Sequence, residues 1–522
     1  MSTPPGASHF FFPKGRAPLM SWGSDALGVT EDTFEMIKAV TSGITTGAGV
    51  AGIHMDDLIS WVPVDTPFFD STPRKGAPQG ALFAVWQALQ NINNTQPDGG
   101  VQADYAAPLV NIENQYMYSP FATIGAGGTV SWDALSQGQN YADVLAVDTL
   151  QSINQQLISL DIHQLNAQSF ALPACPAPTL SPVASGGTIP TATAVYVKCA
   201  ARSGLNYYRG GSGVASGEAT VTTAAASSSV TGFVTAVKGA AAYDWFVGGA
   251  AGGEVYYTTT STNTVTVTFV PTGAQKVPAL AGIYNSGNPG PAVPAADSSY
   301  QPYWQNGLTA SILGDFSASL DQLGLTGTVA NLVTPGTGTP QGAYYQSLDG
   351  GQLTVSGAAV EQIDAMNRSI YDTYQLTPNR MLVSSQVIND LADAVLDSPQ
   401  AITWLPIAPD GRDRVTVGGA VAIYLNKTVN GKPITLELQP HLPPGMIVSV
   451  VDEVPFPGAN IATTLEVETL YDFFRFDYGA NRETGVANGG PRYDFEVRSR
   501  QAFKNKASAL MGVLCNIAPG LS

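Results

Sequence analysis

The chain has 522 residues, of which 55 are glycine and 36 are proline, and only 12% are charged. Its formal net charge of −17 excludes the basic face of a dedicated nucleic-acid-binding protein and disfavours docking to an anionic membrane. Hydrophobic residues make up 44% of the chain, which is enough for sizeable cores and excludes a disordered acidic tail. No apolar run reaches the length of a membrane-spanning helix.

The cysteines and the first residues bear on the cellular compartment. Three cysteines without a C-x-x-C pair provide neither a disulfide framework nor a zinc site. Cys175 and Cys199 could pair under oxidising conditions, but the odd total with Cys515 favours a reducing compartment. The N-terminus lacks the basic and apolar regions of a secretory signal. We therefore expect a soluble protein that is made inside the cell.

The first 140 residues are predicted to be mostly extended. Residues 1–65 form a loose arm, rich in proline and glycine at first, with a short amphipathic stretch at 30–40. Residues 66–140 alternate in hydropathy and are interrupted by prolines, as a long edge hairpin would be. Glycine and asparagine at 91–100 supply its turn.

A long helix is predicted at 141–167, with Asn140 as its N-cap and Pro173 preventing its continuation. Apolar residues at helical spacing are expected to form its buried stripe, namely Leu150, Ile153, Leu157 and Leu160. Polar residues are expected on the opposite side, namely Gln151, Gln155, Gln156 and Asp161.

Residues 173–285 form a charge-poor region rich in Thr, Val, Ser and Ala. Seven strand-like runs separated by Gly/Ser turns predict a β-sandwich, and they include TATAVYVKCAAR, GLNYYRG and AAYDWFVGG. The last of these runs resembles the immunoglobulin-like or fibronectin type III class, where a Tyr and a Trp on one strand pack between the sheets. We expect Tyr243 and Trp245 to lie in the core, and a sugar-binding platform is the alternative.

After 286 a mixed α/β pattern resumes, covering 286–450 and the closing strands at 451–522. Helices are expected at 357–374 and in SQVINDLADAVL, and strands in RMLVSS, MIVSVV and TTLEVETLYDFFRF. Asn430-Gly431 predicts a hairpin turn. Because the same style of domain is predicted on both sides of the β-rich region, we interpret that region as an insertion into an older α+β domain.

The glycine motifs and the histidines give little sign of chemistry. Gly47–Gly52 matches G-x-G-x-x-G but follows a helical segment, so a flexible arm is favoured over a nucleotide site. Gly125–Thr129 is phosphate-loop-like but lacks the lysine that contacts phosphates. The four histidines have no metal-ligand spacing, and they are His9, His54, His163 and His441. We expect His163, on the long helix, to be a packed or surface residue.

Carboxylates cluster at three places, which are Asp56-Asp57, Asp452-Glu453 and Glu466 with Glu468. The last pair shares one strand face, as glycosidase acids might, but solvated strand edges are favoured. Basic residues at 475–506 are Arg475, Arg482, Arg492, Arg498, Arg500, Lys504 and Lys506. Acidic residues alternate with them, namely Asp472, Asp477, Glu483, Asp494 and Glu496, which favours ion pairs between subunits. The sequence therefore predicts no catalytic, cofactor-binding or metal-binding residue.

The order of these parts resembles the major capsid protein of tailed bacteriophages, whose fold is shared with encapsulins and the herpesvirus capsid floor. Short stretches of sequence are also similar to the family: DTPFFDSTPRKG before ALFAVWQ, LTPNRMLVSSQVINDL, LPPGMIVSVVDEV and FEVRSRQAFKNKASALMGVLCNI. The resemblance implies an N-terminal arm at 1–65, an E-loop hairpin at 66–140 and a P-domain spine helix at 141–172. It further implies an inserted sandwich at 173–285, mainly A-domain at 286–450 and P-domain return strands at 451–522.

The resemblance implies a non-enzymatic shell subunit without cofactors. Such subunits assemble with copies of themselves into hexamers and pentamers of an icosahedral virion shell around double-stranded DNA, in the bacterial cytoplasm. Portal, scaffolding and cement proteins are the further partners implied, and no membrane is. Lys75 is the obvious loop lysine, but no cross-linking partners can be matched to it. The alternatives are an encapsulin-like compartment and a secreted or surface carbohydrate-binding protein or glycosidase.

Overall fold

The computed structural model describes residues 64–93, 111–138, 143–278, 287–301, 303–313, 343–356, 359–397, 423–429, 431–454, 463–482 and 491–521. All of them belong to one unit, Val64–Ser522. All but the last two residues of the loose arm expected at 1–65 lie outside the described residues, and so does the whole glycine motif at 47–52. Among the described helices, none has the length and hydropathy to cross a membrane.

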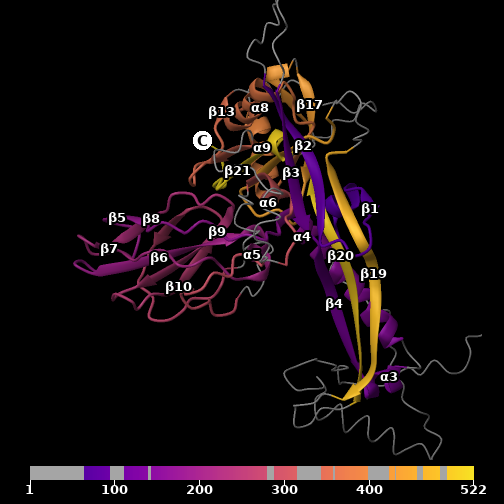
Figure 1. Cartoon of the computed structure of the whole chain (residues 1–522). Coiled ribbons are helices and arrows are strands. Elements are labelled where there is room, and N and C mark those ends of the chain that lie inside the picture. Colours follow the sequence, from indigo (N-terminus) through magenta and orange to yellow (C-terminus); the bar gives the residue numbers. More distant parts are fainter. Residues whose placement is uncertain are drawn as a thin grey trace, which may run out of the picture. The chain divides into compact units, whose positions relative to one another are not determined.

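A four-stranded sheet contains strands from the N-terminal and C-terminal parts of this unit, in the order β1-β19-β20-β4 (Figure 1). Its longest strands are β19 (Leu465–Arg482) and β20 (Pro491–Asn505), which pair antiparallel. The chain's earlier part adds β4 (Ala122–Ser131) antiparallel to β20 and β1 (Arg74–Gly76) parallel to β19. Strands from before and after the β-rich region therefore share one sheet, as an insertion requires.

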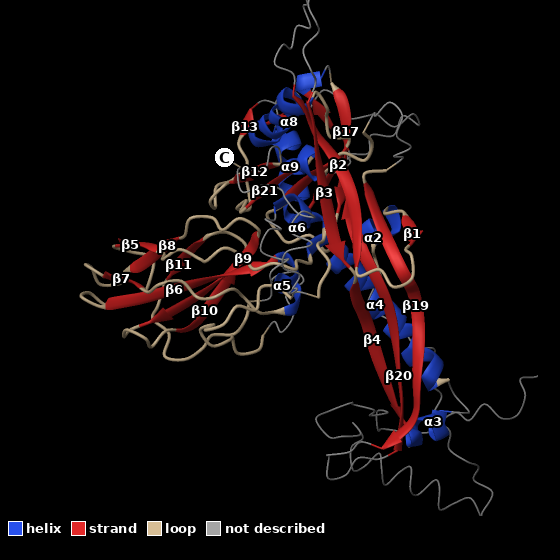
Figure 2. Cartoon of the chain, in the orientation of Figure 1, coloured by secondary structure: helices blue, strands red, loops and turns tan. Residues whose placement is uncertain are grey.

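The long helix is α4 (Val144–Asn166), and it lies along β4 and β20 (Figure 2). Its N-cap is Asp143, whose side chain accepts a hydrogen bond from the Ala146 N–H, whereas the expected cap Asn140 lies outside the described residues. The helix exists where the sequence predicted it.

The predicted faces of α4 were wrong in part. Leu150 is 55% exposed, whereas Gln156 and Asp161, expected on the polar side, are fully buried. The buried amide of Gln156 donates to the Ile124 carbonyl of β4 at 3.2 Å. Polar side chains are buried here because the backbones of β4 and α2 offer them hydrogen-bond partners.

Residues 66–140 contain more helix than predicted. TPFF forms the short helix α2 (Pro67–Ser71) with Pro67 in its first turn, where the missing N–H costs nothing. A second short helix, α3 (Trp132–Gly138), follows β4. The expected hairpin is present as β2 (Phe83–Asn93) and β3 (Asn111–Pro120), which pair antiparallel in a two-stranded sheet.

A six-stranded sheet has the order β12-β21-β18-β15-β17-β16. Its strands are β12 (Tyr344–Ser347), β21 (Gly512–Cys515), β18 (Ile447–Val450), β15 (Arg380–Val383), β17 (Lys432–Leu438) and β16 (Ile423–Asn426). Packed with it are α8 (Glu361–Tyr374), α9 (Ser385–Asp397) and α6 (Leu308–Leu313). The helices and strands predicted between 357 and 475 are confirmed, and Ile363, Met366 and Ile370 are buried as expected.

Two antiparallel sheets make up the β-rich segment, residues 173–299. One has the order β10-β9-β6-β7 and the other β11-β8-β5. Their strands are β5 (Thr179–Val183), β6 (Ala194–Ser203), β7 (Ala219–Thr222), β8 (Ser229–Phe233), β9 (Ala240–Gly248), β10 (Val255–Thr260) and β11 (Thr264–Val267). The run GLNYYRG was predicted as a strand and is instead the helix α5 (Gly204–Arg209). The strand β5 was missed because Pro182 interrupts it at a sheet edge.

Tyr243 and Trp245 lie between the two sheets and are fully buried. The expectation of core packing is confirmed, and the alternative of a sugar-binding platform is wrong for these two residues. The indole N–H of Trp245 donates to Thr260 Oγ1 at 2.9 Å, so its polar atom is satisfied inside the segment.

The two ends of the β-rich segment lie side by side. The Gly307 N–H donates to the Ala167 carbonyl at 2.7 Å, and Ser169 donates to Asn306 Oδ1 through both its N–H and its hydroxyl. The Leu172 N–H also donates to Ser299 Oγ. The chain therefore leaves the end of α4 and returns to it.

Gly128 of β4 tests the close contact between α4 and the long sheet. A Cβ there would lie 2.3 Å from Asp148 Oδ2 on α4 and 2.4 Å from the Phe495 ring on β20. We expect Gly128→Ala to lower the free energy of unfolding by about 1–3 kcal/mol, because neither neighbour can move away freely.

Its neighbour Gly127 is the matched control, since a Cβ at that position would meet nothing closer than 3.5 Å. Gly127→Ala should change the free energy of unfolding by less than about 0.5 kcal/mol. Denaturant unfolding of both variants measures the difference, and equal losses would contradict the close-packing argument.

Candidate functional site

The structure separates the residues that the sequence singled out for chemistry. His9, His54, Asp56 and Asp57 lie outside the described residues. Gly125–Thr129 is part of β4 and forms no loop. Within the described ranges, no three His, Cys, Asp or Glu side chains are placed to hold a metal ion.

His163 is held neutral on the last turn of α4. Its ring contacts Trp304 edge to face, with centroids 5.9 Å apart. Burial, reinforced by the nearby Arg209 cation, lowers the pKa of His163 from 6.5 to about 4. The expectation of a packed residue is confirmed.

A buried carboxylate joins three segments near the end of α4. Asp161 is fully buried, and its Oδ1 accepts the Phe69 N–H of α2 at 2.8 Å. Its Oδ2 lies 2.6 Å from Nδ1 of His441, which follows β17. The carboxylate thereby connects the base of the hairpin region, the long helix and the six-stranded sheet.

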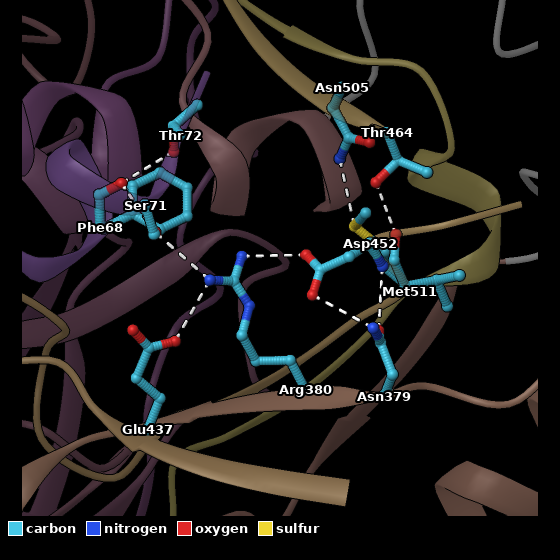
Figure 3. A network of polar contacts seen from close by, with 11 residues as sticks. Phe68, Ser71, Thr72, Asn379, Arg380, Glu437, Asp452, Thr464, Asn505 and Met511 are labelled. Atoms are coloured by element: carbon cyan, nitrogen blue, oxygen red, sulfur yellow. Dashed lines mark hydrogen bonds and ion pairs between the residues drawn. The ribbon is translucent and has the colours of Figure 1, made fainter. Parts of the chain in front are cut away.

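Arg380 is the centre of a second polar network, drawn in Figure 3. Its guanidinium pairs with Glu437 Oε2 at 3.2 Å and with Asp452 Oδ1 at 3.0 Å. The same group donates to Ser71 Oγ at 3.3 Å. Asn379 completes the network, because its side chain donates to Asp452 Oδ2 and accepts the Asp452 N–H.

This network ties α2 to three parts of the six-stranded sheet region, namely β15, β17 and the residues after β18. Burial and the neighbouring Asp452 raise the pKa of Glu437, although Arg380 opposes that shift. One cation therefore serves two carboxylates that would otherwise repel each other. The sequence drew attention to Asp452 but not to Arg380 or Glu437, because their pairing depends on strand order.

Glu466 and Glu468 do share one strand face, as predicted, but they are neither an acid pair nor solvated. Each is largely buried and forms an ion pair with a lysine at the end of β20: Glu468 pairs with Lys504 of the strand, and Glu466 pairs with Lys506 just after it. The strand register sets Glu466 opposite Lys504, and each carboxylate pairs with a lysine along the same face. These ion pairs thereby help to hold β19 against the end of β20.

Other charges at 472–498 also form ion pairs within the subunit, while the ion pairs expected between subunits stay a prediction. The pairs are Arg74–Asp472, Arg475–Asp477, Arg492–Asp494 and Arg498–Glu496. They are partly exposed, so each contributes little to stability.

An exposed aromatic row lies on β19 beside these pairs. Phe474, Phe476 and Tyr478 are 52%, 38% and 52% exposed. The two phenylalanine rings are 4.6 Å apart, Arg498 lies over Phe476, and the Tyr478 hydroxyl donates to Glu496 at 2.8 Å. The strand register sets Phe474 and Phe476 opposite Arg498 and Glu496, so these rings lie on the face of the long sheet opposite to the buried Phe495 and Val497 and form an exposed apolar surface.

The three cysteines are free and buried. Burial raises the pKa of the Cys199 thiol and raises that of Cys515 to about 11. Such thiols are poor nucleophiles and poor metal ligands at neutral pH.

No protein-family description matches the chain, and no curated protein matches it. Among solved structures, it is similar to a chain of the cyanophage A-1(L) capsid asymmetric unit at 12% identity and a TM-score of 0.42, covering 90% of this chain and 97% of that one. It is also similar to a chain of the capsid of Myoviridae phage XM1 at 6% identity and a TM-score of 0.38, covering 89% and 96%. A chain of the native GTA particle capsid matches at 8% identity and a TM-score of 0.38, covering 91% and 98%.

Arg380→Gln tests the four-segment network. We expect a loss of about 1–3 kcal/mol in the free energy of unfolding at pH 7, less than for a fully buried pair because the groups are partly exposed. The variant removes the cation that lowers the pKa of Glu437, and so raises that pKa further in the folded state. Its deficit should therefore shrink as the pH falls and Glu437 becomes protonated.

Denaturant unfolding of the variant and the parent at pH 7 and at about pH 5 measures this change. Arg368→Gln is the control, because Arg368 pairs with Asp372 on an exposed face. A deficit of the same size at both pH values would contradict the assigned role of Arg380.

His163→Gln tests the buried imidazole. The unfolded state takes up a proton near pH 6.5, whereas the folded state does so only near pH 4. The parent should therefore lose stability as the pH falls from 6.5 towards 4, and the variant should lose less. The difference between the two unfolding free energies across this range is the measurement, and parallel curves would contradict it.

Proposed function

We propose that the chain is the major capsid protein of a tailed phage, a non-enzymatic subunit of an icosahedral shell that encloses double-stranded DNA. The observation that carries the proposal is the β2–β3 hairpin. Its strands have 11 and 10 residues, and among the described strands no third one joins their sheet. An isolated two-stranded ribbon is marginally stable in water, so its stability must come from another surface.

The exposed aromatic row on β19 supplies a surface of the kind that an assembling subunit needs. Phe474, Phe476 and Tyr478 combine a desolvatable apolar area with hydrogen-bonding and cationic neighbours. Aromatic residues and arginine are enriched in protein interfaces. We assign this row to contacts between copies of the subunit.

We propose the following division of labour along the chain. Residues 1–65 and 66–140 are the arm and the E-loop, which reach neighbouring subunits. Residues 141–172 and 451–522 form the P-domain, and 286–450 form mainly the A-domain of hexamers and pentamers. The subunit would occupy the virion shell after assembly in the bacterial cytoplasm. Portal, scaffolding and cement proteins are its further proposed partners.

The β-rich segment is proposed to be an immunoglobulin-like domain on the outer surface of the shell. Counting β5 as strand B, the pair β5–β8 corresponds to B–E, and β7-β6-β9-β10 corresponds to C′-C-F-G. Tyr243 then lies on strand F, and its hydroxyl accepts the N–H of Val237, six residues upstream, at 3.0 Å. This contact has the geometry of a tyrosine corner.

The proposed domain extends past the residue 285 expected from composition. The Val277 N–H donates to the Asn288 carbonyl, and the Gly290 N–H donates to the Gln275 carbonyl. The Ser298 N–H donates to the Ser212 carbonyl. We therefore propose residue 299 as its end.

Phe474→Ser combined with Phe476→Ser tests the assembly surface. Both side chains are exposed, so the folded subunit should keep its unfolding free energy within about 1 kcal/mol. Shell yield should fall at least tenfold, because each truncation removes apolar area from a contact repeated on every subunit. Sedimentation and electron microscopy of the purified full chain measure particles against free subunits.

Phe269→Ser is the matched control, since Phe269 is 39% exposed but belongs to the β-rich segment. It should leave shell yield unchanged. If the parent chain forms particles without hexamer and pentamer organisation, the proposed function is wrong. If the parent chain assembles into organised shells and the double variant assembles equally well, only the assigned surface is wrong.

A further inference from the structure

The β-rich segment contacts the rest of the subunit at places other than its two ends. The first is the end of α4, where Gly204 approaches Asn166 so closely that a Cβ would lie 2.8 Å from Asn166 Oδ1. Tyr208 of α5 contacts the His441 ring edge to face, with centroids 6.3 Å apart. Leu205 packs with Ala167 and Trp304 in one apolar cluster.

The second contact is with the six-stranded sheet, at the turn after β12. Asn263 is fully buried between β10 and β11, and its side-chain N–H donates to Asp349 Oδ1 at 2.8 Å. The same amide donates to the Val234 carbonyl at 2.6 Å, which fixes its orientation. Gly350 has a φ of 77°, and a Cβ there would lie 2.8 Å from Thr264 Oγ1.

Two further features join the segment to the strands of that sheet. Ala241, at the start of β9, packs in the same apolar cluster as Leu165 of α4, Val448 of β18 and Val513 of β21. The Tyr243 hydroxyl, which accepts the Val237 N–H, also lies near the side chain of Asn516, just after β21. The segment is thus fixed to α4 and to the six-stranded sheet at once.

We propose that the β-rich segment is an internal brace, which holds the six-stranded sheet and α4 in one fixed relation. The buried Asn263–Asp349 hydrogen bond is its contact with the sheet, and the close approach of Gly204 to Asn166 is its counterpart on the α4 side. A domain that only decorated the surface of the subunit would need no contact with it other than the two chain connections. The proposal is independent of the shell function, because it concerns the single subunit.

Hydrogen exchange in the full chain tests the brace at residues 348–350. The Leu348 N–H donates to the Cys515 carbonyl and the Gly350 N–H to the Asn516 carbonyl, so their exchange reports opening between β12 and β21. Asn263→Ala removes the bond to Asp349, and we expect these two amides to exchange about tenfold faster.

Thr260→Val is the matched control, because it removes the 2.9 Å hydrogen bond from Trp245 entirely within the segment. It should speed exchange in β9 and β10 and leave Leu348 and Gly350 unchanged. The pair Asn263→Asp with Asp349→Asn exchanges donor and acceptor. It should recover part of the protection that Asn263→Asp alone loses, as a direct contact requires.

Unchanged exchange at Leu348 and Gly350 in Asn263→Ala would overturn the brace. So would equal acceleration in Thr260→Val, since the effect would then reflect general loosening of the segment. These outcomes are read on the subunit and remain distinct from any failure to form shells.

Discussion

The buried carboxylate of Asp161 is the constraint on which the arrangement of the subunit depends. A buried charge must be paired and hydrogen-bonded, so the positions of its partners are fixed with it. Those partners are the Phe69 N–H of α2 and the imidazole of His441. One side chain near the end of α4 thereby binds α2, at the start of the hairpin region, and the residues that follow β17 of the six-stranded sheet. Arg380 repeats this logic a short distance away, with Ser71, Glu437 and Asp452.

The long sheet and the hairpin distribute apolar surface unequally. On the α4 side the sheet is packed so closely that Gly128 has no room for a Cβ. On β19 the aromatic rings of Phe474 and Phe476 remain exposed, and the β2–β3 pair has no third strand among the described residues. A subunit built in this way has a stable centre and surfaces that gain most from neighbours, which is the physical basis of the proposed shell function.

The β-rich segment is integrated with the rest of the subunit more closely than its composition suggested. Few of its residues are charged, yet buried polar groups make its contacts, including Asn263 and Ser299. Hydrogen bonds of fixed direction specify orientation better than apolar contact alone. Contacts of this kind are the physical basis of the brace that we propose between α4 and the six-stranded sheet.

The sequence by itself determined α4, α8, α9 and most of the strands, because hydrophobic periodicity and glycine or proline boundaries are local properties. It also predicted that Tyr243 and Trp245 are core residues. Only the tertiary structure decided that Gln156 and Asp161 are buried while Leu150 is exposed, since burial depends on what packs against a helix face. The same holds for GLNYYRG, whose helix covers a sheet, and for Glu466 and Glu468, whose lysine partners lie about 40 residues away. The sequence pattern carries no information about which distant residues pair, and the polar networks are made of such long-range pairs.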